Sequence, residues 1–368
     1  MAAANRLLIR RLKTLLAPKG AGASPLRSPS HHGPTMTDIR YDVLGIGNAI
    51  VDVIAPTQDD FLVTHQLNKG AMMLIDENRA ETLYAAMGPA QIISGGCAAN
   101  TASGVASLGG RASFIGKVRN DTLGKLFAQN IHAFKVSFTT EAAVSGPATA
   151  RSMIMVTPDG ERTMNTYLGA CLGLAPEDVD EATVAASAYA YLEGYLWDPP
   201  LAKEAFRKAA KIAHAAGRKV ALTLSDAFCV DRYRDEFMEL LRSRTVDVLF
   251  ANEHELKSLF VTEDFDTAVA AIRDTGALGV VTRGAQGAMT VTRDETVSVP
   301  AFPIERLVDT TGAGDLFASG FLYGLARSAT GTDCLRLGAL AAAEVITHLG
   351  ARPERSLREL AQQERLID

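Results

Sequence analysis

The sequence predicts an α/β fold in which a mostly parallel, doubly wound sheet is flanked by helices and accompanied by a small second sheet. In the second half of the chain, short apolar runs typical of strands alternate with longer runs typical of helices. In the first half, the segments 53–76 and 145–170 interrupt this alternation with one-sided polarity. Such polarity is typical of an antiparallel sheet, so we expect these segments to form a lid over the carboxyl edge of the main sheet.

Each element follows from its local sequence. Residues 41–47 form an apolar run that ends in a glycine turn, and residues 97–108 are small, helix-compatible residues that two glycines end. A hairpin is expected at 151–167, because Pro158, Asp159 and Gly160 separate two strand-like runs. The other expected strands are 112–115, 189–192, 219–224, 246–250 and 278–282, and the other expected helices are 202–216, 231–242, 253–260, 267–275 and 316–326.

Composition and charge argue against several classes of protein. The chain has 368 residues and is 47% hydrophobic, which suits one large domain, and its net charge of −5 gives no electrostatic case for binding nucleic acid. Its four cysteines form no CxxC pair, which argues against a zinc site or a disulfide framework and fits a reducing compartment such as the cytoplasm. No apolar run reaches about 18 residues, so no membrane partner is expected.

The first 35 residues differ from the rest, because they hold six Lys and Arg residues and no acidic residue. This composition fits either a transit peptide or a disordered leader in front of an initiator at Met36. The second interpretation is favoured, so residues 1–36 are expected to be a disordered leader and residues 37–368 the folded domain.

The strongest chemical signal is the sequence DTTGAGD, which runs from Asp309 to Asp315 and precedes an apolar helix. Gly312, Ala313 and Gly314 allow a sharp turn that presents several N–H groups at a helix N-terminus, where anions bind readily. Asp315, in the first turn of that helix, is suited to accept the proton of a substrate hydroxyl during phosphoryl transfer. The chain contains no GxxxxGK[ST] motif, so its phosphate site must be of another kind.

Two weaker signals suit a sugar. Gly95 and Gly96 let a ligand approach the backbone closely, and Asn100 offers a donor and an acceptor to a hydroxyl group. Asp52 follows an apolar strand, where its carboxylate can accept two hydrogen bonds from a vicinal diol. Taken alone, the segment from Gly95 to Asn100 also fits an ordinary strand-to-helix turn with a helix asparagine.

Two further signals suit a nucleotide. Asn252 and Glu255 can hold hydrated magnesium and phosphate oxygens, although the same pattern also fits a helix N-cap. The glycine-rich turn with Thr282, Gly284 and Gly287 can line the phosphates or ribose of a nucleotide, or it can be an ordinary hairpin.

Residues 95–110 and 309–315 together resemble the two signatures of the ribokinase, or PfkB-type, carbohydrate kinase family, and Asn252 and Glu255 fall between them. The resemblance runs from about Tyr41 to the end of the chain. It implies a ribokinase-like, Rossmann-like fold with a β lid, and an enzyme that phosphorylates a hydroxymethyl group. It implies ATP and Mg²⁺ as cofactors, and the family often uses K⁺ near the anion loop.

The resemblance also implies a role for each matched position. Asp315 matches the catalytic base. The other implied roles are an anion hole at Gly312, Ala313 and Gly314; contacts to sugar hydroxyls from Asp52, Gly96 and Asn100; magnesium and phosphate binding by Asn252 and Glu255, with Glu255 acting through water; and an ATP-side turn at Thr282, Gly284 and Gly287.

Within the family the chain looks most like the adenosine kinases. Arg162, Met164 and Leu168 match a phosphate-directed arginine and apolar base contacts in the lid, and Phe228 matches an aromatic ring near the nucleoside. The expected reaction is phosphorylation of the 5′-hydroxyl of adenosine to AMP, by a monomer or a homodimer. Two alternatives stay open: a kinase for ribose, fructose or a related sugar, because Leu196 stands where a second ring is expected, and a non-catalytic nucleotide or sugar sensor.

Overall fold

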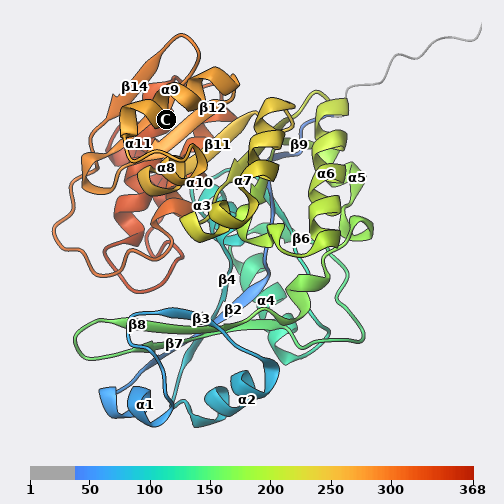
Figure 1. The fold of residues 1–368 in the computed structure, drawn as a ribbon, viewed down its shortest axis with the longest axis vertical. Coiled ribbons are helices and arrows are strands. Elements are labelled where there is room, and N and C mark those ends of the chain that lie inside the picture. Colours follow the sequence, from blue (N-terminus) through green and yellow to red (C-terminus); the bar gives the residue numbers. More distant parts are fainter. Residues whose placement is uncertain (1–37) are drawn as a thin grey trace, which may run out of the picture. The chain divides into compact units, whose positions relative to one another are not determined.

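A nine-stranded sheet is the larger of two sheets in the computed structural model, which describes residues 38–368 (Figure 1). The leader expected over residues 1–36 lies outside this range. The strand order is β14-β13-β12-β11-β10-β9-β1-β5-β6; the pairs from β12 to β6 are parallel, and β13 and β14 add an antiparallel edge. The strands are β1 (Tyr41–Ile46), β5 (Ala112–Ile115), β6 (Val136–Phe138), β9 (Ser187–Glu193), β10 (Lys219–Thr223), β11 (Val248–Asn252), β12 (Leu278–Thr282), β13 (Ala288–Val291) and β14 (Thr296–Val299).

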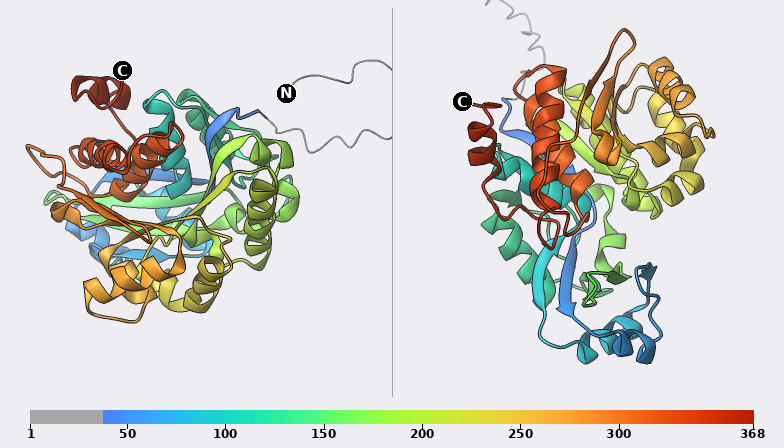
Figure 2. Two further views of the ribbon diagram at one scale, coloured as in Figure 1. Left: turned by 90° about the horizontal axis from the view of Figure 1, so that it is seen from above. Right: turned by 90° about the vertical axis from the view of Figure 1, so that its left-hand side faces the viewer.

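Helices cover both faces of this sheet, as the alternation of strands and helices predicted (Figure 2). Leu44 and Ile46 of β1 share a buried core with α5–α9, whereas Val43 shares another with α3, α4, α10 and α11. Alternate residues of one strand therefore point into two apolar cores. The helices are α3 (Cys97–Ser107), α4 (Thr122–Ala133), α5 (Glu181–Ala185), α6 (Pro200–Ala215), α7 (Ala227–Arg242), α8 (Glu253–Leu259), α9 (Phe265–Thr275), α10 (Ala313–Leu325), α11 (Gly331–Val345) and α12 (Leu357–Gln363). None of the helices in the described range is both long and apolar enough to cross a bilayer.

The second sheet has five strands in the order β3-β8-β7-β2-β4 and lies in the lower part of Figure 1. Its strands are β2 (Ile50–Pro56), β3 (Met72–Leu74), β4 (Gln91–Gly95), β7 (Ala150–Val156) and β8 (Arg162–Tyr167). Helices α1 (Asp59–Thr64) and α2 (Glu77–Ala86) pack on one face, where Leu83 meets Met153 and Met155. The hairpin expected at 151–167 corresponds to β7 and β8.

Two elements of this sheet differ from the expectation. The segment 53–76, expected to be strand-like, contains α1 as well as strands, because Leu62 packs into the core under the sheet and two acidic residues start the helix. The strand β4 was not expected, since its run of five residues ends in a glycine and is too short to show a period.

The chain passes between the two sheets at points that lie against each other. One passage joins β1 to β2 through Asn48, and another joins β4 to α3 through Gly96. Gly96 has a φ of +92°, and a Cβ added to it would lie 2.0 Å from the backbone oxygen of Asn48. Only glycine fits this close approach, so the two passages are fixed together at the carboxyl end of β1.

Candidate active site

A cavity of about 780 Å³ lies at the carboxyl ends of the central strands and reaches the inner face of the second sheet. Ligands bind at this edge in parallel α/β sheets, and the volume suits a ligand of nucleotide size. Thirteen of the residues that the sequence indicated line it: Asp52, Gly96, Asn100, Met164, Leu168, Phe228, Asn252, Glu255, Thr282, Gly312, Ala313, Gly314 and Asp315. Arg162, Gly284 and Gly287 are not among the lining residues.

The glycine-rich turn starts α10. Gly312 is the N-cap with a φ of +79°, and a Cβ on it would lie 2.7 Å from the Cβ of Ala351. Within residues 38–368, the amides of Gly312, Gly314 and Asp315 donate to no other group. These free N–H groups at a helix N-terminus can bind an anion.

Asp315 is held by the neighbouring helix α3. Asn100 Nδ2 donates to Asp315 Oδ2 at 2.9 Å, and Thr101 Oγ1 donates to the Asp315 backbone oxygen at 3.1 Å. Burial raises the pKa of Asp315 to about 6, although hydrogen bonds from Asn100 and Cys97 and the charge of Arg352 favour the ionised form. The carboxylate is therefore ionised at neutral pH and basic enough to accept a proton.

Asp52 lies on β2, on the face of the second sheet that borders the cavity. Burial raises its pKa to about 6, and the charges of Arg162 and Arg352 oppose this rise. A Cβ on Gly95 would lie 2.4 Å from Asp52 Oδ2, so the glycine makes room for this carboxylate. The carboxylates of Asp52 and Asp315 thus lie in the same cavity.

Glu193 at the end of β9 and Asn48 after β1 are among the lining residues that were not selected from the sequence. Glu193 accepts hydrogen bonds from Asn48 Nδ2 at 2.8 Å and from the backbone N of Ala98 at 3.0 Å, and burial raises its pKa to about 7. The only available signal was an acid that directly follows an apolar strand.

The amide oxygens of Asn48 and Asn100 have a shared property that points to a ligand. Both Oδ1 atoms are buried, and neither has a hydrogen-bond partner in the described part of the chain. Buried acceptors of this kind are costly unless a donor reaches them. Because both residues line the cavity, hydroxyl groups of a ligand are suited to supply those donors.

Asn252 and Glu255 form the helix cap that the sequence offered as one interpretation, and they also lie in the cavity, where the magnesium role stays a prediction. They form a reciprocal cap at the start of α8, in which Asn252 Oδ1 accepts from the Glu255 N–H at 2.9 Å and Glu255 Oε2 accepts from the Asn252 N–H at 2.9 Å. Both also line the cavity. Burial raises the pKa of Glu255 to about 7, and among the described residues this carboxylate has no cationic partner. The pair therefore fits a hydrated divalent cation.

In the glycine-rich turn after β12, one residue lines the cavity and another is needed for packing. Thr282, the last residue of β12, lines the cavity. Gly284 has a φ of +55° and open space around it. A Cβ on Gly287 would lie 2.0 Å from the backbone oxygen of Val299, so this glycine is required for the packing of β13 beside β14.

Apolar side chains occupy the mouth of the cavity and the end that the second sheet forms. Met164 and Leu168 lie there with Met72 and Leu74 of β3, whose exposed fractions are 48% and 56%. Phe228, at the start of α7, is 68% exposed, and the Arg232 guanidinium lies 4.6 Å from its ring centroid. Exposed apolar groups that face one cavity can be covered by a flat ligand.

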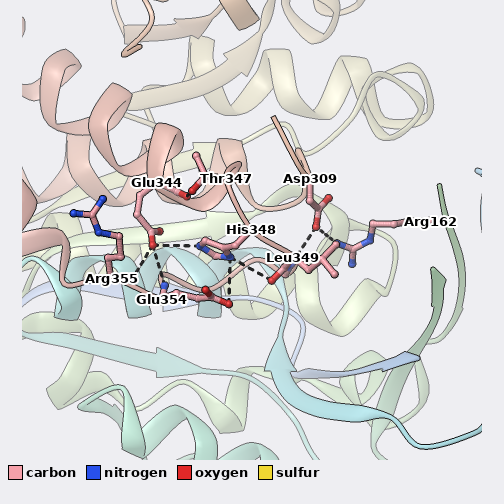
Figure 3. Close-up of polar contacts among 9 residues, drawn as sticks. Arg162, Asp309, Glu344, Thr347, His348, Leu349, Glu354 and Arg355 are labelled. Carbon is pink, nitrogen blue, oxygen red and sulfur yellow. Dashed lines mark hydrogen bonds and ion pairs between the residues drawn. The ribbon is translucent and has the colours of Figure 1, made fainter. Parts of the chain in front are cut away.

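Arg162 makes a contact that the sequence did not indicate. It extends from β8 and pairs with Asp309, the residue at which the DTTGAGD segment begins (Figure 3). The Asp309 carboxylate also accepts from the N–H groups of Thr311 and Gly350, each at 3.0 Å. This ion pair connects the second sheet with the loop that leads into the anion-binding turn.

Known proteins give the following matches. A family model described as pfkB family carbohydrate kinase matches residues 74–357. The adenosine kinase from Sinorhizobium meliloti, a solved structure, is 55% identical with a TM-score of 0.83, covering 88% of this chain and 99% of that one. A probable sugar kinase from Rhizobium etli CFN 42 is 53% identical with a TM-score of 0.84, covering 89% and 100%. Adenosine kinase 2 from Arabidopsis thaliana is 24% identical, covering 84% and 95%.

Proposed function

The chain belongs to the pfkB family of carbohydrate kinases, and on this basis we propose that it transfers the γ-phosphoryl group of ATP to the 5′-hydroxyl of adenosine. Kinase activity and the use of ATP follow from the family. The acceptor is our proposal, and one observation carries it: Asp315 with its free helix amides shares a cavity with apolar lid residues. The S. meliloti enzyme, 55% identical and described as an adenosine kinase, supports the same acceptor.

The ribose is bound by the polar end of the cavity. Asp52 accepts hydrogen bonds from two adjacent hydroxyl groups, and the unpartnered oxygens of Asn48 and Asn100 accept from others. Asn100 also donates to Asp315, so the residue that binds the ribose orients the base as well. This arrangement directs the 5′-hydroxyl toward Asp315.

Phosphoryl transfer uses the first turn of α10. The ionised Asp315 takes the proton of the 5′-hydroxyl while its oxygen bonds to the γ-phosphorus and the bond from that phosphorus to the β,γ-bridging oxygen breaks, releasing ADP. The free amides of Gly312, Gly314 and Asp315 stabilise the charge on the transferred group. Asn252 and Glu255 would hold hydrated Mg²⁺, which neutralises phosphate charge when bound.

The adenine ring suits the apolar end. Met72, Leu74, Met164 and Leu168 present thioether and aliphatic surfaces, which favour a flat aromatic base over the hydroxyl groups of a second sugar. We propose that the second sheet acts as the lid that closes over this base and excludes water, which limits hydrolysis of ATP.

A free sugar is the second candidate acceptor. Glu193 adds a buried carboxylate to the cavity, which the carboxylates of Asp52, Glu255 and Asp315 also line, and this suits additional hydroxyl groups. The R. etli protein, 53% identical, is described as a probable sugar kinase. The two candidates differ only at the apolar end of the cavity.

The test is ADP release from Mg-ATP over a panel of acceptors: adenosine, inosine, guanosine, ribose, fructose and 2-keto-3-deoxygluconate. We expect turnover with adenosine and little with the free sugars, and loss of that turnover in Asp315→Asn. Turnover with a free sugar alone would replace the acceptor and keep the base. Nucleotide binding without turnover of any acceptor would contradict the proposed reaction and favour a sensor.

A further inference from the structure

Arg352 is a buried arginine with unusual partners. It is 4% exposed and lies in the loop after α11. Its Nε donates to the backbone oxygen of Ser94 at 2.9 Å, its Nη2 donates to Ser94 Oγ at 3.1 Å, and its Nη1 donates to the Ala99 backbone oxygen and to Ser103 Oγ. All four acceptors are neutral, and no carboxylate of the described residues forms an ion pair with it.

A buried guanidinium without a paired carboxylate is costly unless opposite charge lies close by. Asp52 on β2 and Asp315 on α10 supply that charge, because both raise the pKa of Arg352 against the effect of burial, which lowers it to about 10. Arg352 in turn lowers the pKa of both carboxyl groups. The guanidinium is therefore charged at neutral pH, and its charge acts on two carboxylates that line the cavity.

Other charged or titratable groups face these carboxylates from the surrounding elements. Arg162 on β8 acts on Asp52, but it is already paired with Asp309. Cys97 on α3 bonds to Asp315, and Glu193 on β9 adds negative charge. Arg352 is the cation that acts on both Asp52 and Asp315 among the described residues.

The loop that carries Arg352 also contacts the anion-binding turn. Gly350, which lies two residues before Arg352, donates its N–H to the Asp309 carboxylate. Ala351 lies close to Gly312, since a Cβ added to Gly312 would be 2.7 Å from the Cβ of Ala351. This loop therefore packs against the turn that starts α10, while the side chain of Arg352 binds α3.

A buried carboxylate on α11 holds the far side of this loop. Glu344 Oε1 accepts from the backbone N–H groups of Glu354 at 3.0 Å and Arg355 at 2.9 Å, and it lies 3.2 Å from His348 Nε2 (Figure 3). The loop is thus fixed on both sides of Arg352. A fixed loop gives the guanidinium a defined position relative to the cavity.

From these contacts we propose that Arg352 is a positioning residue of the active site. It ties α3, which carries Asn100, to the loop behind the anion-binding turn, and it supplies a shared positive charge to Asp52 and Asp315. The proposal rests on the proposed function, because it takes Asp315 to be the base. Its effect is on the ionisation of the base and on the alignment of α3 and α10, without contact with the substrate.

Three variants test it by the pH dependence of kcat and kcat/KM with the acceptor that the panel identifies. Arg352→Gln removes the charge, so we expect the pKa of the Asp315 base to rise. The acid limb, which is the low-pH side of the rate profile, should move upward by about one pH unit, and the lost turnover should be partly recovered at alkaline pH. Arg352→Lys keeps the charge but cannot bond four acceptors, so we expect a nearly unchanged acid limb and a several-fold lower kcat. Arg327→Gln is the control, since Arg327 pairs with Asp42 at the amino end of β1, away from the cavity.

An Arg352→Gln enzyme with the wild-type acid limb would overturn the proposal, however much its thermal stability changes. If that variant does not fold, Arg352→Lys is the test instead. An acid limb of Arg352→Lys that moves upward by about one pH unit would overturn the shared-charge role. If the wild type turns over no acceptor, the proposed function fails separately. The carboxylate titration is then followed by infrared difference spectroscopy against Asp315→Asn and Asp52→Asn, and an unchanged titration in Arg352→Gln overturns the inference.

Discussion

Asp315 and Asp52 both carry a pKa of about 6, well above the usual 3.8, because the fold buries them. A carboxyl group with a raised pKa in the folded state contributes stability below its unfolded pKa and loses that contribution as the pH rises through its folded pKa. The ionised forms of these carboxyl groups, which the reaction needs, therefore destabilise the fold above about pH 6. Active sites commonly retain such a cost for the sake of function.

The residue-scale prediction is that Asp315→Asn loses activity and gains stability. We expect turnover to fall about 10²–10⁴-fold, since the general base is removed. We expect the melting temperature to rise by a few degrees at about pH 8, because a neutral amide avoids the cost of burying a charge, and to change little at about pH 4. Thermal unfolding at the two pH values measures this, with the exposed Asp274→Asn as control. A lower melting temperature of Asp315→Asn at alkaline pH would contradict the expected stabilisation.

At the scale of the element, glycines let the helices that carry the site pack at close range. A Cβ on Gly104 of α3 would lie 2.3 Å from Ser319 Oγ of α10, and one on Gly320 of α10 would lie 2.3 Å from the backbone oxygen of Leu337 on α11. The first turn of α10 holds Asp315 and α3 holds Asn100, so the spacing of these helices sets the distance between base and sugar site.

The element-scale prediction concerns Gly320→Ala. The added methyl group meets backbone atoms of α11, so we expect α10 to shift and the free energy of unfolding to fall by about 1–3 kcal/mol, after a partial offset from helix propensity. Chemical denaturation measures the change, and kcat should fall as well because Asp315 moves with the helix. Gly173→Ala is the control for the added methyl group, since no atom lies within 4 Å of its added Cβ. Equal stability of both variants would show that the close contact is not required.

At the scale of the whole molecule, one cavity is lined by both sheets. Asp52 and Met164 come from the second sheet, whereas Asn252 and Thr282 come from the ends of strands in the first. A ligand that fills the cavity must contact both sheets and so adds its binding free energy to the stability of the fold.

The prediction at this scale is that adenosine raises the melting temperature and that Asp52→Ala abolishes most of this rise. At about 100 times its Kd a ligand adds about 2.7 kcal/mol. Mg-ATP should still stabilise Asp52→Ala, because Asp52 lies at the ribose end of the cavity. Asp59→Ala on α1 is the control, since Asp59 pairs with Lys69 on the outer side of the second sheet. Loss of the ATP effect instead of the adenosine effect would show that Asp52 has been assigned to the wrong ligand.

The sequence by itself determined the alternation that gives the doubly covered sheet, the hairpin of β7 and β8, and the family, which local patterns are sufficient to specify. It also determined which turn starts the helix of Asp315, because a glycine turn before an apolar run is a local signal. It did not show α1 or β4 in the second sheet, since packing of single residues such as Leu62 decides such short elements.

Only the tertiary structure decided the roles of the residues around that turn. Asn48 and Glu193 are 145 positions apart, and Arg352 and Ser94 are 258 apart, yet each pair is in hydrogen-bond contact. No local period encodes such contacts, because the chain must first fold to bring them together. The burial that raises the pKa of Asp315 to about 6 is likewise a property of the packed molecule, which is why the sequence indicated the base and the fold sets its ionisation.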